Sequence, residues 1–483
     1  MIRTFFSFLL CTFACPGDER PNVVILLADD LGYGEVSCLN PKGKIPTPNL
    51  DQLAKDGMTF TDAHSGSSVC TPTRYGLLTG RYCWRSRLQN GVLTGGESLF
   101  AKDRYTLPKL LKTKEYHTCI IGKWHLGMKF DGKKNVAKKI PVGTKVTHGP
   151  LDRGGFDEFH GFHHARQMSL WIDNDKLTRQ MEHVDMLPDL TECAVNYIAS
   201  RKGKADPFFL YVPWNSPHSP VVPNAKWKGK SGINDHADFV MQTDDSCGQV
   251  LKALEDHGFK DNTIVIFSCD NGTSPTTSGL PDLKKVGHNP SGKLRGMKAD
   301  FWDGGHRVPF LVRWPGKVKA GSTNRGLTCL NDIYATLAEI TGVTYPETEG
   351  VDSISFLPSL TGESGKHART DVVHHSYMGL FAIRQGPWKL LCGPGSGGWG
   401  KPRPHEAIKQ GKPMVQLYHM EKDLGESKNL HIEHPEKVKE LRALLEKQIA
   451  DGRTTPGPRQ TNDVDQVVID KMDKSKSKKK SGR

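Results

Sequence analysis

The segment SSVCTPTRYGLLTGRY, residues 67–82, contains Cys70, which is followed closely by Pro72 and Arg74. Cys70 could act in four ways: as a thiolate nucleophile, a metal ligand, a disulfide partner, or a residue that is chemically converted after synthesis. Pro72 fits the first turn of a helix that begins near Cys70. The free backbone N–H groups of such a helix start favour a bound anion and a negatively charged nucleophile.

The eleven cysteines of the chain are scattered and form neither a disulfide framework nor a CxxC zinc motif. Most of them fit the interior as small apolar side chains. The sequence does not decide whether Cys83 and Cys119 form a disulfide bond. Cys70 lies in no spacing pattern that suggests a disulfide partner. The spacing therefore disfavours a disulfide at Cys70.

Four apolar runs end in polar residues that can bind metals or anions. PNVVILLADD ends in Asp29 and Asp30, YHTCIIGKWHLG contains Lys123 and His125, DPFFLYVPWNSPHSP contains His218, and NTIVIFSCDNG ends near Asp270 and Asn271. Continuous apolar runs are typical of buried parallel strands. Ligands of open α/β folds bind beyond the carboxyl ends of such strands. The four endings therefore predict one convergent site.

The residues of this set suggest a metal ion and an anionic substrate. Asp29, Asp30, Asp270 and Asn271 offer only oxygen ligands, which favour calcium or magnesium over zinc. Paired aspartates also cap helices and DNG is also a turn signal, so neither motif is decisive alone. The cationic or donor side chains, namely Arg74, Lys123, His218 and Lys298, suit an anionic tetrahedral substrate.

Strand and helix patterns alternate along the chain. TPNLDQLAKDG and NDHADFVMQTDDSCGQVLKALEDHG are typical of helices, and RVPFLVRWPG adds a further strand. This alternation predicts an α/β sandwich around a large, mainly parallel sheet.

CTPTRYGLLTGR resembles the sulfatase signature C-x-P-[ST]-R-x-x-L-x-T-G-[RK] at every specified position. NVVILLADDLGYG, GKWHLG, SPHSP, SCDNG and LRGMKADFWDGGHRVPF resemble the other active-site motifs of that family, in its order. The resemblance spans residues 21 to about 445. It points to the formylglycine-dependent, arylsulfatase-like sulfatases of the alkaline-phosphatase superfamily.

This resemblance implies a domain organisation. We expect an alkaline-phosphatase-like catalytic α/β domain over residues 21–365, with a mixed, mainly parallel sheet. A smaller C-terminal α+β subdomain is expected over residues 366–450. Its antiparallel sheet includes LFAIRQGPWKLL and MVQLYHMEKDLGESKNL, and its helix is PEKVKELRALLEKQI.

The resemblance also implies that a formylglycine-generating enzyme converts Cys70 to formylglycine (3-oxoalanine). One hydroxyl of its hydrate attacks the sulfate ester, and the other collapses to the aldehyde and expels sulfate. One Ca²⁺, in preference to Mg²⁺, is expected to be held by residue 70 together with Asp29, Asp30, Asp270 and Asn271.

The other roles follow from the same resemblance. Arg74 and Lys123 orient the hydrate, and His125 takes the proton of its second hydroxyl. His218 and Lys298 bind sulfate and assist the leaving alcohol. His288 and His148 are weaker candidates for substrate contacts.

The expected activity is hydrolysis of sulfate esters, on a sulfated carbohydrate in preference to an aryl sulfate. One rival is a phosphodiesterase or phosphonate monoester hydrolase of the same superfamily. A second is a catalytically silent sulfoglycan-binding protein, which the intact Cys70, His125 and Lys298 disfavour.

Nearly half of the net charge of +13 lies at the end of the chain. KMDKSKSKKKSGR contains seven basic residues and one acidic residue, so its removal leaves about +7. We expect residues 451–483 to form a basic disordered tail. No zinc-finger, RNP or helix-turn-helix motif suggests a nucleic-acid partner.

The N-terminus carries Arg3 and the apolar run Phe5–Phe13, which is typical of a signal peptide over residues 1–14. We expect an exported protein that is periplasmic, secreted or bound to the cell surface. Membrane contact is expected only through lipidation at Cys15 or through the basic tail.

Overall fold

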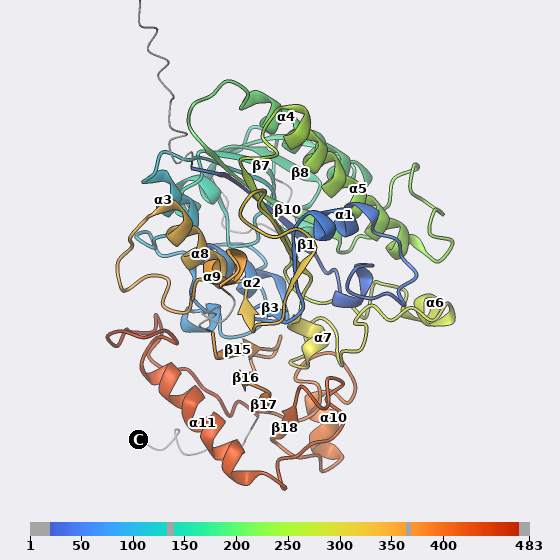
Figure 1. Ribbon diagram of the computed structural model, residues 1–483, viewed down its shortest axis with the longest axis vertical. Coiled ribbons are helices and arrows are strands. Elements are labelled where there is room, and N and C mark those ends of the chain that lie inside the picture. Colours follow the sequence, from blue (N-terminus) through green and yellow to red (C-terminus); the bar gives the residue numbers. More distant parts are fainter. Residues whose placement is uncertain (1–19, 133–139, 364–368, 473–483) are drawn as a thin grey trace, which may run out of the picture.

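A ten-stranded mixed sheet crosses the larger part of the computed structural model, which describes residues 20–132, 140–363 and 369–472 (Figure 1). In spatial order the strands are β13 (Ser322–Asn324), β2 (Met58–Phe60), β12 (Phe310–Arg313), β11 (Thr263–Cys269), β1 (Asn22–Asp29), β10 (Phe208–Pro217), β4 (His117–Lys123), β7 (Glu158–Phe162), β8 (Leu170–Asp173) and β9 (Lys176–Gln180). The central five, from β11 to β7, are mutually parallel. The predicted mainly parallel sheet is confirmed.

The central strands form because both of their faces are covered. Every residue of β1, β10 and β11 is buried. A strand buried on both faces has no polar face, which explains the continuous apolar runs in the sequence.

Helices cover the two faces of the sheet (Figure 1). One layer contains α1 (Pro48–Asp56), α4 (Met186–Ser200) and α5 (Asp235–Asp256), and the other contains α2 (Cys70–Thr79), α3 (Leu107–Lys112), α8 (Asp332–Thr341) and α9 (Leu357–Leu360). The long helix α5 is capped by the preceding residue, Asn234, whose side chain accepts a hydrogen bond from the Ala237 N–H.

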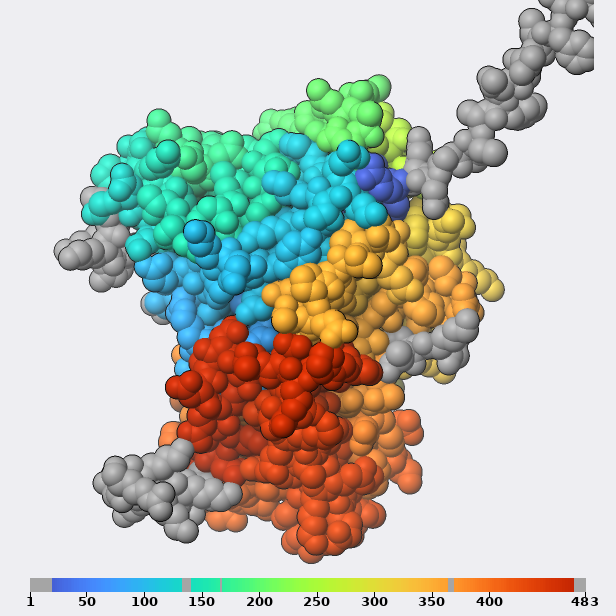
Figure 2. Space-filling model, turned by 90° about the vertical axis from the view of Figure 1, so that its left-hand side faces the viewer, coloured from blue at the N-terminus to red at the C-terminus, as the bar shows by residue number. Residues whose placement is uncertain are grey.

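A second, four-stranded antiparallel sheet lies below the first (Figure 1). Its strands are β15 (Asp371–His375), β16 (Phe381–Gln385), β17 (Trp388–Leu391) and β18 (Gln416–His419), accompanied by α10 (Pro404–Lys409) and α11 (Pro435–Ala450). Leu441 and Leu445 of α11 pack with Phe381 and Ile383 of β16 in one apolar cluster. Figure 2 shows this C-terminal part as a lobe beneath the remainder of the molecule.

The shorter elements connect these layers. They are the paired strands β3 (Ala63–His64) and β14 (Thr328–Cys329), the paired strands β5 (Lys129–Phe130) and β6 (Val146–His148), and the helices α6 (Leu280–Lys285) and α7 (Asp303–His306).

The expected disordered tail over residues 451–483 is wrong for residues 451–472. Residues 451–472, hereafter the C-terminal segment, pack against the rest of the chain. Asn462 accepts a hydrogen bond from Arg85 at 3.0 Å, Asp463 pairs with Arg81 at 3.0 Å, and Asp470 pairs with Arg442 at 2.7 Å. The acidic and amide side chains of this segment match two buried arginines, Arg81 and Arg85, and the partly exposed Arg442, whereas the lysine-rich residues 473–483 lie outside the described residues.

Three further expectations concern residues that the structure does not describe. The signal peptide at residues 1–14, Cys15, and the boundary between residues 365 and 366 lie outside the described residues. Within the described part, no helix is both long and apolar enough to cross a membrane. The nine described cysteines, including Cys83 and Cys119, are free thiols. The disulfide bond considered between Cys83 and Cys119 is therefore not formed.

Candidate active site

The carboxyl ends of four neighbouring strands meet at one edge of the sheet. Asp29 ends β1 and Lys123 ends β4, while His218 and Asp270 directly follow β10 and β11. Because β1 lies between β10 and β11, these side chains are brought together from positions far apart in the sequence.

Cys70 is the first residue of α2, at the same edge of the sheet. Its Sγ lies 3.6 Å from Oδ1 of Asp29. Burial raises the pKa of the Cys70 thiol to about 12, although Lys123 and Lys298 oppose this shift. The encoded cysteine is therefore a protonated thiol at neutral pH.

Arg74 lies one turn after Cys70 on the same face of α2, because residues four apart are neighbours on a helix. Its Nη2 and Nε lie 2.7 and 3.1 Å from Oδ2 of Asp270. Its Nη1 donates to the carbonyl of Lys123 at 3.1 Å. Arg74 thus joins α2 to the ends of β11 and β4.

Two lysines pair with the two aspartates after β1. Lys123 Nζ lies 2.5 Å from Asp29, and Lys298 Nζ lies 2.5 and 2.7 Å from the two oxygens of Asp30. Burial alone would raise the pKa of Asp29, but Lys123, His218 and Arg74 hold it well below its ordinary value. Asp29 is therefore ionised.

Asp270 behaves differently from Asp29. Burial and the neighbouring charge of Asp29 raise the pKa of Asp270 to about 6, although Arg74 opposes this. Two nearby carboxylates with separated pKa values are typical of sites that move protons.

The side chains fit a divalent cation. Asn271 Nδ2 donates to Asp30 at 2.8 Å and to the Gly272 carbonyl at 2.9 Å, while its buried Oδ1 has no hydrogen-bond partner among the described residues. Ligand atoms of Asp29, Asp30, Cys70 and His218 all lie within 4.8 Å of one another. Unsatisfied oxygen atoms beside carboxylates match the preference of calcium and magnesium.

The formal charges of the site residues show what a bound cation would do to the net charge. The carboxylates of Asp29, Asp30 and Asp270 balance the three cations Arg74, Lys123 and Lys298. A divalent cation would give the cluster a net positive charge, which favours an anionic substrate.

Both expected histidines lie at this edge. His125 Nε2 contacts the Leu93 carbonyl at 2.8 Å, and its Nδ1 is unpartnered among the described residues. Burial, followed by Lys123 and Arg74, lowers the pKa of His125 well below its ordinary value, so its ring is neutral. His218 Nδ1 lies 2.6 Å from the Ser219 carbonyl, and Nε2 faces Asp30 at 3.7 Å.

Backbone strain is concentrated here. Asp30, His125 and Ala299 adopt φ values of 68°, 57° and 79°. Left-handed conformations of residues with a side chain are costly and cluster at functional sites.

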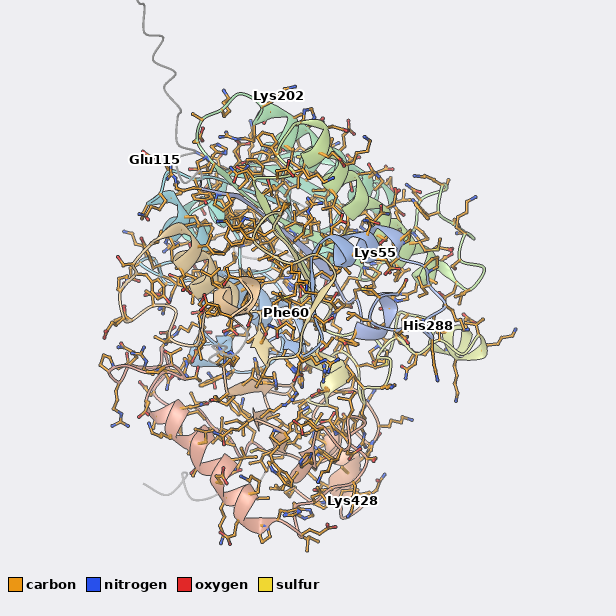
Figure 3. The ribbon with its side chains drawn as sticks, viewed as in Figure 1. Lys55, Phe60, Glu115, Lys202, His288 and Lys428 are labelled. Carbon is orange, nitrogen blue, oxygen red and sulfur yellow. The ribbon has the colours of Figure 1, made fainter. Side chains whose placement is uncertain are left out.

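The two weaker candidates for substrate contacts, His148 and His288, form no hydrogen bond with the site residues in the described part of the chain. His148 forms an ion pair with Asp152 at 2.8 Å, in a half-exposed position. His288 Nδ1 accepts from the Lys44 N–H at 3.0 Å, and Figure 3 shows His288 at the side of the molecule.

His163 and His164, which directly follow β7, also lie near this edge but were not predicted from the sequence. The His163 carbonyl accepts a hydrogen bond from the His125 N–H at 2.7 Å. The His164 ring lies 5.7 Å from that of His125 and its Nε2 contacts the Thr94 carbonyl. Like several other site residues, these two histidines follow the carboxyl end of a strand. That strand, β7, is short and mixes polar with apolar residues, so a search for apolar runs does not detect it.

The fold and the site define a hydrolase in which carboxylates, cations and histidines at the strand ends surround the first residue of a helix. The chain matches the family model described as Sulfatase over residues 21–343. It belongs to the sulfatase family of the alkaline-phosphatase superfamily, and it is a sulfatase, an enzyme that hydrolyses sulfate esters.

Relatives and solved structures agree with this family. A Bacteroides thetaiotaomicron protein named N-acetylgalactosamine-6-O-sulfatase is 31% identical and covers 89% of this chain and 93% of its own length. Arylsulfatase A of Bos taurus is 32% identical, covering 76% of this chain and 74% of its own length. A solved B. thetaiotaomicron protein, described with the metabolism of multiple glycosaminoglycans, has a TM-score of 0.79 at 28% identity and covers 89% of this chain and 99% of its own.

A second structure is informative about ligands. Ps i-CgsB, solved in complex with k-i-k-neocarrahexaose, has a TM-score of 0.71 at 26% identity. It covers 92% of this chain and 95% of its own.

Proposed function

We propose that this sulfatase removes sulfate from a sulfated carbohydrate, using formylglycine made from Cys70 and one calcium ion. The names of the N-acetylgalactosamine-6-sulfatases from B. thetaiotaomicron and Homo sapiens support a sulfated amino sugar of a glycosaminoglycan. The complex of Ps i-CgsB with an oligosaccharide supports the same class.

One observation carries the conversion of Cys70. Its side chain points into a cluster of oxygen donors and cations, 3.6 Å from Asp29, where a hard cation is expected. A hydroxyl oxygen suits that cation better than sulfur does. Converted to formylglycine, residue 70 supplies in its hydrate one hydroxyl to attack the ester and a second whose deprotonation releases sulfate.

The metal would be held by residue 70 with Asp29, Asp30, Asp270 and Asn271. When bound, calcium supplies a positive charge that polarises a sulfate oxygen and favours an ionised nucleophile. Magnesium fits less well because it demands near-octahedral geometry and dehydrates reluctantly.

The remaining side chains act on protons and on substrate charge. Arg74 orients residue 70, since it lies one turn along α2 and is fixed by Asp270. Lys123 neutralises charge beside residue 70. His125, held neutral by burial, accepts a proton at its unpartnered Nδ1 during sulfate release.

The sulfate group is expected to lie between His218 and Lys298. Lys298 contributes a buried ammonium group that binds a sulfate oxygen. His218 Nε2 faces the site and can donate to the ester oxygen of the departing alcohol when protonated.

Maturation requires a formylglycine-generating enzyme as a transient partner, which we propose acts on CTPTR at residues 70–74. Export through a signal peptide at residues 1–14 is part of the same proposal, because glycosaminoglycans and other sulfated polymers are extracellular. N-terminal sequencing of the mature protein checks the cleavage.

The experiment measures the mass of the peptide that contains residue 70 after co-expression with a formylglycine-generating enzyme. An aldehyde at residue 70, with sulfate release that disappears in Cys70→Ala and persists in the control Cys193→Ala, is the expected result. An unmodified thiol with undiminished turnover contradicts the proposal. Substrates are a 6-O-sulfated N-acetylgalactosamine, its 4-O-sulfated isomer, an aryl sulfate and a phosphodiester.

A further inference from the structure

Two aromatic side chains from connections between strands of the C-terminal sheet lie together at the surface. Tyr377 follows β15 and Trp399 follows β17, and their ring centroids are 5.2 Å apart at an angle of 53°. Tyr377 is 36% exposed and Trp399 is half-buried. No role in the reaction has been assigned to either ring.

Backbone hydrogen bonds fix this pair against the loop that carries Lys298. The Tyr377 N–H donates to the carbonyl of Ala299 at 3.0 Å. On the other side of Trp399, the Gly400 N–H donates to Asp300 at 2.8 Å. The aromatic pair therefore adjoins the residues that directly follow Lys298.

The approach of the loop before Trp399 is too close for a larger residue. A Cβ on Gly398 would lie 2.1 Å from the carbonyl oxygen of Ala299. Glycine at position 398 lets the backbone reach the Lys298 loop, which holds Trp399 in place.

Tyr377 also contacts the segment that precedes Leu93. Its carbonyl accepts a hydrogen bond from the Gly91 N–H at 2.7 Å. Two residues further on, the Leu93 carbonyl contacts His125. Tyr377 thus bridges the loop that positions His125 and the loop that carries Lys298.

Exposed cations follow Trp399 in the sequence. Residues 399–412 contain one acidic residue, Glu406, and four exposed basic residues: Lys401, Arg403, Lys409 and Lys412. Arg403 Nε donates to the Trp399 backbone carbonyl at 3.4 Å, and Lys401 is two residues from Trp399 in the sequence. None of the four basic side chains forms an ion pair within the described chain.

We propose that Tyr377, Trp399 and the adjacent cations Lys401 and Arg403 form a binding subsite for the sugar next to the sulfated one. The ligand is an anionic oligosaccharide whose neighbouring unit carries a carboxylate or a second sulfate. This inference rests on the proposed function, since it assumes a carbohydrate at Lys298. Aromatic faces cover the apolar face of a sugar ring, and lysine and arginine pair with its anionic groups.

The test compares a sulfated monosaccharide with an anionic tetrasaccharide that carries the same sulfated sugar at its end. Trp399→Ala is expected to lower kcat/KM for the tetrasaccharide roughly tenfold, in line with the truncation of an aromatic contact, and to leave the monosaccharide unchanged. Trp399→Phe should keep most of the tetrasaccharide activity. Trp227→Ala, on the loop that precedes α5, is the matched control and should change neither substrate.

A second measurement does not depend on turnover. Binding of the tetrasaccharide to Cys70→Ala is titrated by calorimetry with and without Trp399→Ala, at two salt concentrations. The double variant Lys401→Ala/Arg403→Ala should bind more weakly at low salt and lose most of its salt dependence.

The outcomes separate the two proposals. Equal losses on both substrates in Trp399→Ala, or no loss on either, overturn the subsite. If the wild-type enzyme with formylglycine released sulfate from neither sugar but cleaved an aryl sulfate, the proposal of a sulfated carbohydrate as substrate would be wrong. Titration with the tetrasaccharide would then still decide whether the subsite binds it.

Discussion

The ammonium group of Lys298 lies 2.5 and 2.7 Å from the two carboxylate oxygens of Asp30, and both side chains are buried. Lys123 makes the corresponding contact with Asp29 at 2.5 Å. Each of these two carboxylates therefore already has a lysine partner. A divalent cation at Asp30 would have to share its oxygens with Lys298, so the proposed metal and sulfate sites would place opposite demands on this lysine.

Lys298→Met should separate these demands. Loss of the ammonium removes a competing positive charge, so calcium affinity should rise about tenfold or more. Loss of the sulfate contact should lower kcat/KM by about 10²–10³. Calcium titration by calorimetry and steady-state kinetics measure the two effects, with Lys252→Met on the exposed face of α5 as control. A fall in calcium affinity would contradict the competition.

Calcium should stabilise the fold. At 100 times its dissociation constant, a ligand that binds only the native state adds about 2.7 kcal/mol to the free energy of unfolding. Removal of calcium with a chelator should lower the midpoint of thermal unfolding, and magnesium should restore less of it. Asn271→Ala should shrink the increment at a fixed calcium concentration, because the unpartnered Oδ1 is lost. An unchanged increment in that variant would remove Asn271 from the metal site.

Arg85 connects the C-terminal segment with Asp352. It is fully buried, contacts both oxygens of Asp352 at 2.8 Å, and donates to Asn462. Arg85→Ala leaves the Asp352 carboxylate buried without its partner, which should cost about 3–5 kcal/mol in urea unfolding. Lys252→Ala, which breaks an exposed pair with Asp256, should leave the midpoint nearly unchanged. Similar behaviour of the two variants would show that the buried pair is unimportant.

Stability should fall at alkaline pH because of His160. Burial opposes its charge, but Asp173 and Glu158 raise the pKa of His160 to about 9 from its ordinary value of 6.5. A raised histidine pKa contributes stability that is complete below pH 6.5 and is lost as the pH rises through 9. The loss should be about 1–2 kcal/mol, since the side chain is 22% exposed.

The measurement is urea unfolding at pH 6, 7.5 and 9.5. His160→Gln removes the titrating group and should flatten the change between pH 6.5 and 9.5. A variant that loses stability as steeply as the wild type would assign the change to other groups.

The mainly parallel sheet could be predicted because its central strands are buried on both faces and therefore read as continuous apolar runs. The same rule predicted that Asp29, Lys123, His218 and Asp270 would meet, because parallel strands end at one edge. The antiparallel strands β8 and β9 at the sheet edge were missed, since their exposed face breaks the apolar pattern.

Other features depend on contacts that composition does not encode. His163 and His164 follow a strand of five residues in which polar side chains alternate with apolar ones, so its end could not be recognised. The C-terminal segment has few apolar residues and was expected to be disordered. Its order comes from specific pairs such as Asp463 with Arg81, which are 382 residues apart and leave no local signal.

These distant pairs also determine when, during synthesis of the chain, the region after Cys70 can complete its contacts. Arg81 and Arg85 lie just after α2, yet their partners Asp463 and Asn462 are 382 and 377 residues further along the chain. At roughly 5–20 residues per second, the ribosome needs about 20–80 s to supply them. Until then the region after Cys70 lacks its final contacts, which would give the proposed formylglycine-generating enzyme an interval in which to reach a residue that the finished fold encloses.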